Sequence, residues 1–143
     1  MAVQLQGNLV KKAHKKIKYT DKMLADLAKC SDPDTGPMYF MENFLQIQHP
    51  TKGAIKFEPF NFQKNLVKNY HENRFSINML PRQTGKTTCA SAYLLWYAMF
   101  VPDSQILIAA HKYTGAQDIM NRFRYAYESV PDFIRPGIYS YNR

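Results

Sequence analysis

The sequence predicts an α/β fold in which a parallel sheet is flanked by helices, and three consecutive segments carry this prediction. Residues 74–80, RFSINML, alternate apolar side chains with others, as a short strand does. Residues 86–100 are apolar over a length typical of a buried helix, and residues 104–110, SQILIAA, have the continuous apolar character of a central parallel strand. Strand, loop, helix and strand together form the smallest unit of a doubly wound fold.

The remaining segments are expected to be mainly helical. Residues 1–19, which contain KKAHKKIK, predict a flexible basic arm, and residues 20–56 predict a small helical N-terminal region. Apolar spacing and breakers place helices and one short strand as follows: helices over 21–29, 37–47, 60–73 and 115–130, and a strand at 54–58. A further strand is expected to begin at residue 138.

Composition limits the class of protein without defining its function. The 143 residues fit one ordinary domain, and their formal net charge of +8 is compatible with a nucleic acid or another polyanion as partner. Cys30 and Cys89 have no metal-ligand spacing near them and, with no secretory leader expected, are predicted to be reduced and buried. The longest apolar run, residues 92–101, is shorter than the roughly 20 residues of a membrane helix, so a soluble protein is expected.

The loop PRQTGKTT, residues 81–88, has the chemistry of a phosphate-binding loop. Backbone amides before a helix can point at an anion, and a residue without a side chain, Gly85, permits its close approach. Lys86 is then placed to reach the β- and γ-phosphates of a nucleotide, and the Thr87 hydroxyl to bind Mg²⁺. The tripeptide GKT is common by chance, but its place between a strand and a long helix makes the pattern specific.

Two residues near this loop have both a functional and an ordinary interpretation. Arg82 could neutralise charge on a γ-phosphate as an arginine finger does, or could be a solvated loop residue. Gln63 could pair with adenine while Phe60 covers the ring, although a glutamine on an amphipathic helix more often faces solvent.

The order of FNFQ, LPRQTGKTT, ILIAAHK and PDFIRPGI resembles the N-terminal part of the ATPase domain of phage terminase large subunits, the DNA-packaging motors of tailed bacteriophages. The resemblance covers residues 57–141 and is nearest to the T4-like branch. In that family the phosphate loop lacks the first glycine and carries an arginine, so Leu80 and Arg82 fit the pattern. The implied fold is a P-loop NTPase of the RecA-like type.

The resemblance implies roles for particular residues. Gln63 would read adenine with Phe60 beside it, and Lys86 and Arg82 would be catalytic, with Arg82 acting in cis. His111 and Lys112 lie where these motors place a coupling motif, although His111 could equally be a surface residue at a strand end. The residues expected to bind ATP or its Mg²⁺ are Phe60, Gln63, Gln83, Thr84, Gly85, Lys86, Thr87 and Thr88, with Thr87 on the metal.

The sequence departs from the family in what it lacks. Hydrolysis needs an Asp for Mg²⁺ and a following Glu at a strand end, and no apolar strand here ends in paired acids. Residues 57–143 are therefore expected to be the N-terminal part of an ATPase domain, binding ATP with little or no turnover. By resemblance, the partners are double-stranded DNA, the rest of the large subunit, the portal and the small subunit, in the host cytoplasm.

Two other classes of protein stay open at this point. A fragment of a superfamily-2-like helicase, or of another nucleic-acid-dependent ATPase, would continue into a second RecA-like domain rather than a nuclease. A non-enzymatic nucleotide- or DNA-binding module would be complete at this length. ATP binding and turnover by the chain alone would separate these from a terminase fragment.

Overall fold

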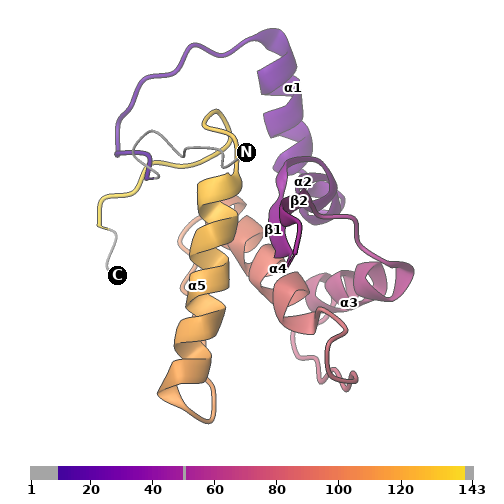
Figure 1. Ribbon diagram of the computed structural model, residues 1–143. Helices are drawn as coiled ribbons and strands as arrows, with labels where there is room; N and C mark the ends of the chain where they lie inside the picture. Colours follow the sequence, from indigo (N-terminus) through magenta and orange to yellow (C-terminus); the bar gives the residue numbers. More distant parts are fainter. Residues whose placement is uncertain (1–9, 50, 141–143) are drawn as a thin grey trace.

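The computed structural model describes residues 10–49 and 51–140, which form five helices and one two-stranded sheet (Figure 1). The helices are α1 (Asp21–Cys30), α2 (Gly36–Phe44), α3 (Asn61–Glu72), α4 (Lys86–Phe100) and α5 (Tyr113–Ser129), and the strands are β1 (Gln46–His49) and β2 (Gly53–Lys56). α4 lies centrally and packs against α2, α3 and α5. The positions expected for α1, α3, α4 and α5 are confirmed to within two residues.

The core forms around α4, which is apolar on most sides. Leu95 and Trp96 of α4 are almost fully buried, with Phe40 and Met41 of α2 and Val67 of α3. The Trp96 indole N–H donates to the carbonyl of Cys30 at 2.8 Å. Because a buried carbonyl at a helix end needs a donor, this bond fixes the end of α1 on α4.

Both cysteines are confirmed as free and buried. Burial away from water disfavours the thiolate, so the pKa of Cys30 is raised to about 12 and that of Cys89 to about 11.

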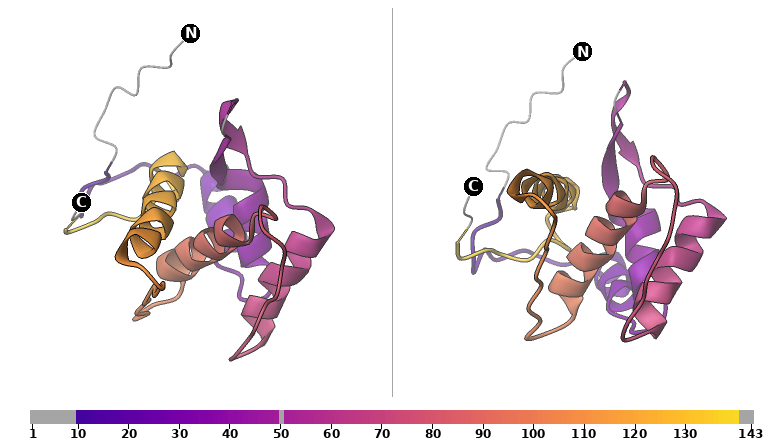
Figure 2. Two further views of the ribbon diagram at one scale, coloured as in Figure 1. Left: turned by 60° about the horizontal axis from the view of Figure 1, so that its bottom comes forward. Right: turned by 90° about the horizontal axis from the view of Figure 1, so that it is seen from below.

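The helix expected over residues 37–47 is shorter than predicted. It ends at Phe44, and the next residues form β1, which pairs antiparallel with β2 through Ile47 and Ile55. A two-stranded hairpin gains its stability from cross-strand and tertiary contacts. The spacing of apolar residues in the sequence does not predict such contacts. Figure 2 shows this hairpin projecting beyond the helices.

The two segments expected as parallel strands, residues 74–80 and 104–110, contain no strand in the structure. A segment forms a ladder only when a second backbone lies beside it, and the one sheet of the described residues is β1–β2. Four of their apolar side chains are strongly exposed: Phe75 83%, Ile77 94%, Met79 92% and Leu107 92%. The parallel sheet therefore stays a prediction.

Part of the basic arm contacts the C-terminal segment. The Lys11 ammonium donates to the carbonyls of Asp132 and Arg135 at 2.9 and 2.6 Å, and Lys15 forms an ion pair with Asp132 at 2.6 Å. Lys12 and Ile138 form an isolated parallel bridge, which is all that the described residues show of the strand expected from 138. Residues 11–15 are thus held against residues 132–138, whereas residues 1–9 of the expected arm lie outside the described residues.

Candidate nucleotide-binding site

The 81–88 loop turns sharply before it enters α4. Gln83 and Gly85 have positive φ angles of 64° and 76°, and Gly85 is the residue that precedes the helix. Left-handed backbone is readily adopted by glycine but costs other residues free energy. Glycine is therefore well suited to this turn. The next residue begins the 15-residue helix α4, where unpaired amides and the helix dipole favour an anion.

Lys86, the first residue of α4, points back toward the loop. Its ammonium donates to the carbonyls of Leu80 and Pro81 at 3.4 and 3.2 Å. Both bonds are longer than usual for a charged donor, so an anion with better geometry could replace them.

Gln63 contacts this loop, and its hydrogen bonds differ from the adenine pairing predicted for it. Its side-chain oxygen accepts from the backbone N–H of Phe60 at 3.0 Å, and its amide donates to the carbonyl of Thr84 at 3.0 Å. Gln63 is buried, with 6% of its surface exposed. In this structure both ends of the amide are occupied, so Gln63 positions the loop rather than presenting a free edge to adenine.

Gly85 has a second role that depends on Gln63. A Cβ added at Gly85 would lie 2.7 Å from the Gln63 amide nitrogen. The sequence assigned this glycine to the approach of a phosphate, whereas in the structure it also leaves room for the Gln63 side chain.

Phe60 and Phe62 form an exposed aromatic pair at the start of α3. Their rings are stacked, with centroids 5.8 Å apart and an interplanar angle of 8°, and 67% of Phe60 is exposed. Phe62 is also largely accessible, with 42% of its surface exposed. The pair is therefore accessible to a flat ligand group close to Gln63.

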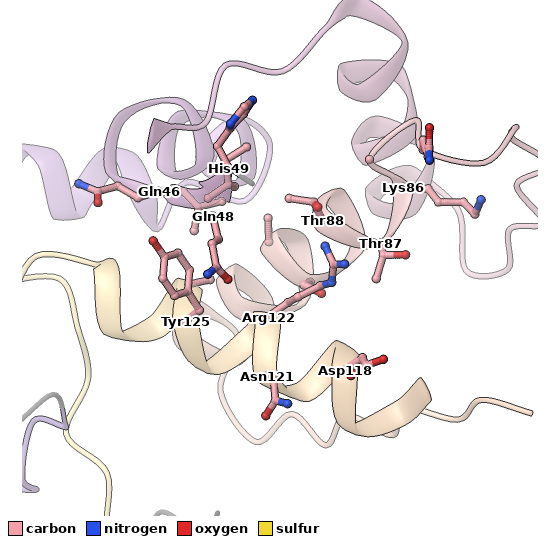
Figure 3. A pocket seen from close by; sticks show the side chains of 17 residues that line it. Gln46, Gln48, His49, Lys86, Thr87, Thr88, Asp118, Asn121, Arg122 and Tyr125 are labelled. Atoms are coloured by element: carbon pink, nitrogen blue, oxygen red, sulfur yellow. The ribbon is translucent and has the colours of Figure 1, made fainter. Parts of the chain in front are cut away.

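A cavity of about 920 Å³, here called the α4–α5 cavity, opens beside the loop between β1, α4 and α5 (Figure 3). Gln83, Gly85, Lys86, Thr87 and Thr88 line one wall. Four residues that the sequence did not single out complete it on the opposite walls: Gln48, Asp118, Arg122 and Tyr125. Their only signal in the sequence is the spacing of residues 118, 122 and 125, which shares one face of a helix.

The cavity also contains a buried polar group that has no partner among the described residues. Ser91, on α4, is 2% exposed and lines the cavity, and its hydroxyl makes no hydrogen bond there. Burying a hydroxyl without a partner is unfavourable, so this position is a polar one in a largely apolar helix.

Arg82, His111 and Lys112 are not brought into this cavity. All three are exposed, and none is among the residues that line it. The structure thus joins the loop to Gln63 through the Thr84 carbonyl, whereas Phe60, Gln63 and Arg82 all lie outside the cavity lining.

A glycine-containing turn that leads into a helix, beside a polar cavity, presents backbone amides that could bind an anion. Residues 77–142 match the family model described as "Terminase large subunit, T4likevirus-type, N-terminal". This match confirms the resemblance to the N-terminal part of phage terminase large subunits that was found in the sequence.

The family match supports a role in a phage terminase and hence in DNA packaging. It covers the 81–88 loop, α4, α5 and the segment that contains His111, but not Phe60 or Gln63. Within residues 10–49 and 51–140, no helix combines the length and apolarity that crossing a membrane would require.

Proposed function

We propose that the 81–88 loop binds the phosphates of ATP, and that this chain supplies the nucleotide-binding portion of a terminase motor that moves double-stranded DNA into a procapsid. The single observation that carries the proposal is the geometry of the loop. Its left-handed turn ends at Gly85, the helix begins at Lys86, and the Lys86 ammonium rests on two weakly bound carbonyls. The family match over residues 77–142, which include this loop, supports it.

The residues present fit a nucleotide and its metal ion. Backbone amides from Gln83 to Thr88 and the Lys86 ammonium would hold phosphate oxygens, and the Thr87 hydroxyl would bind Mg²⁺. The unpartnered Ser91 hydroxyl lines the adjoining cavity. The exposed Phe60 and Phe62 rings would pack against the base, since aromatic rings stack readily on flat ligands.

The P-loop NTPase fold is part of this proposal. Exposed apolar residues at alternate positions, namely Phe75, Ile77 and Met79, are typical of a strand with an open place beside it. Further strands contributed by the rest of a large subunit would cover them.

Turnover by the chain alone is expected to be weak. Activating water for attack on a phosphate needs a carboxylate or an equivalent group near the γ-phosphate. Of the residues that line the α4–α5 cavity, Asp118 alone carries a carboxylate. We propose that the remainder of the large subunit completes the motor. The completed motor would then work with the portal and the small subunit in the host cytoplasm.

Calorimetric titration with Mg-ATP tests the proposal. The unaltered chain should bind ATP, and Lys86→Ala should lower its affinity by at least about tenfold, because a charge-assisted bond to phosphate is lost. Lys22→Ala, an exposed lysine on α1, is the matched control and should bind normally. Equal ATP affinities of Lys86→Ala and Lys22→Ala would show that Lys86 does not bind phosphate. ATP hydrolysis by the chain alone at an ordinary motor rate would contradict the expectation that hydrolysis needs the rest of the large subunit.

A second function is supported by the +8 net charge, namely direct binding of nucleic acid through the basic N-terminal segment. Binding of a DNA duplex that is unchanged by Lys86→Ala but weakened by added salt would support it.

A further inference from the structure

We propose that Arg122 of α5 is a further phosphate-binding residue of the nucleotide site, acting from the wall of the α4–α5 cavity that faces the 81–88 loop. The inference rests on the proposed nucleotide function and extends it to a helix that the loop motif does not include.

The position of Arg122 in the cavity is the first observation. Figure 3 shows its side chain extending from α5 toward the start of α4, where Thr87 and Thr88 lie. Arg122 and Lys86 are the two Lys or Arg side chains among the residues that line the cavity. A polyphosphate that enters beside the loop would therefore meet cations on two walls.

The guanidinium of Arg122 is not committed to another group in the described part of the chain. Asp118 lies one turn before it on α5, but no ion pair within 4.0 Å joins the two, and Figure 3 shows their side chains pointing in different directions. Pairing at this spacing contributes little on an exposed helix, so it would not compete with a phosphate.

The chemistry of arginine suits this place. A guanidinium offers paired N–H donors in a planar fork that matches two phosphate oxygens, and it keeps its charge at any working pH. The buried Ser91 hydroxyl adds a polar group to the α4 wall of the same cavity. Arg82, the arginine that the motif offers for this task, is exposed and lies outside the cavity lining.

The ligand is inferred to be the nucleotide rather than the DNA backbone. The cavity contains the helix start and Lys86, which favour a compact anion, and it is bounded by walls on three elements. A duplex would instead need an open surface along which successive phosphates are contacted.

The test compares Arg122→Gln with Arg124→Gln in the full chain, using Mg-ATP, Mg-ADP and AMP as probes. Arg124 lies on the same helix, donates to the side-chain oxygen of Asn121 at 3.4 Å and does not line the cavity. Arg122→Gln should weaken ATP binding by about 10-fold to 100-fold, the range for loss of charge-assisted hydrogen bonds, and AMP binding by less. Arg124→Gln should stay within about twofold of the unaltered chain.

Thermal unfolding of each variant is measured alongside. If Arg122→Gln does not fold, Arg122→Lys replaces it, and its ATP affinity should fall because the charge remains while the fork is lost. Equal ATP affinities of the Arg122 and Arg124 variants would overturn the inference. So would a loss confined to duplex DNA binding.

Failure of the inference can be told from failure of the proposed function. If Lys86→Ala abolishes ATP binding while Arg122→Gln leaves it intact, the loop assignment stands and the role of Arg122 falls. If Lys86→Ala has no effect, the nucleotide function falls, and the role of Arg122 falls with it.

Discussion

The side-chain amide of Gln63 donates to the backbone carbonyl of Thr84 at 3.0 Å, which joins the start of α3 to the 81–88 loop across 21 residues of sequence. The same side chain accepts from the Phe60 N–H, so it also caps its own helix. One buried residue thus holds both the loop and the exposed aromatic pair in place.

Replacing Gln63 should disturb the loop before it disturbs the rest of the fold. Gln63→Ala is expected to lower the free energy of unfolding by about 1–3 kcal/mol, because buried polar groups lose their partners. Gln63→Glu keeps the acceptor for Phe60 but sets an acceptor against the Thr84 carbonyl, so it should weaken ATP binding as well. Denaturant unfolding and ATP titration check this. Normal ATP affinity in Gln63→Glu would show that the Thr84 bond does not position the loop.

Gly85→Ala should destabilise the chain more than Gly53→Ala does. Both glycines are left-handed, with φ angles of 76° and 72°, so each substitution costs about 1–2 kcal/mol of backbone strain. Only at Gly85 would the new Cβ meet Gln63, whereas nothing lies within 4 Å at Gly53. The excess cost of Gly85→Ala, measured by denaturant unfolding, should be about 1 kcal/mol.

A double-mutant cycle isolates this contact. In a chain that already carries Gln63→Ala, the excess should disappear, because the side chain that the Cβ would meet is gone. An unchanged excess would mean that the glycine is required for another reason.

The free energy of unfolding should fall in acid because the Asp132 carboxylate becomes protonated and loses its ionic hydrogen bonds. Hydrogen bonds from Arg135 and Lys15, each at 2.6 Å, hold the pKa of the Asp132 carboxyl at about 2. An unfolded Asp has a pKa of about 3.9, so this contribution is fully present above about pH 5 and is lost as the pH falls toward 2. Urea unfolding at several pH values should show the difference between the unaltered chain and Asp132→Asn shrinking over this interval. A difference that is constant from pH 5 to 2 would contradict the assignment.

The exposed apolar segments should make the isolated chain associate. Ile77 and Leu107 are each more than nine-tenths exposed, on the two segments that the sequence assigns to strands. Ile77→Lys should reduce association in sedimentation velocity without lowering the unfolding midpoint, since the side chain has few contacts to lose. Leu95→Lys, at a buried position of α4, should instead prevent folding. Association that is unaffected by Ile77→Lys would show that another surface is responsible.

How far the sequence predicted the structure differs from element to element. The bounds of α4 follow from its apolar run and from Pro102, and the structure has the same bounds. The strand expected at 54–58 is found as β2, but β1 was missed because Ile47 also fits a helical stripe and only its pairing with Ile55 decides for a strand. The segments 74–80 and 104–110 have strand-like sequences, but a ladder depends on a neighbouring backbone that local sequence does not encode.

The site shows the same division. The 81–88 loop is a local motif, so the sequence can propose its residues, with the helix that follows as context. Arg122 enters through the packing of α5 beside α4, and the Gln63 bond to Thr84 depends on how α3 docks. The Gln63 bond leaves no pattern in a single sequence, and Arg122 leaves only its helical spacing with residues 118 and 125.

The central claim, that the 81–88 loop binds nucleotide phosphates, is tested most directly by following backbone amide resonances of the ¹⁵N-labelled chain during titration with Mg-ATP. The account predicts that the amides of Gln83 to Thr88 and the side-chain amide of Gln63 shift with one common affinity, and that Lys86→Ala removes these shifts. Shifts confined to the basic N-terminal segment, or shifts in the loop that persist in Lys86→Ala, would contradict it.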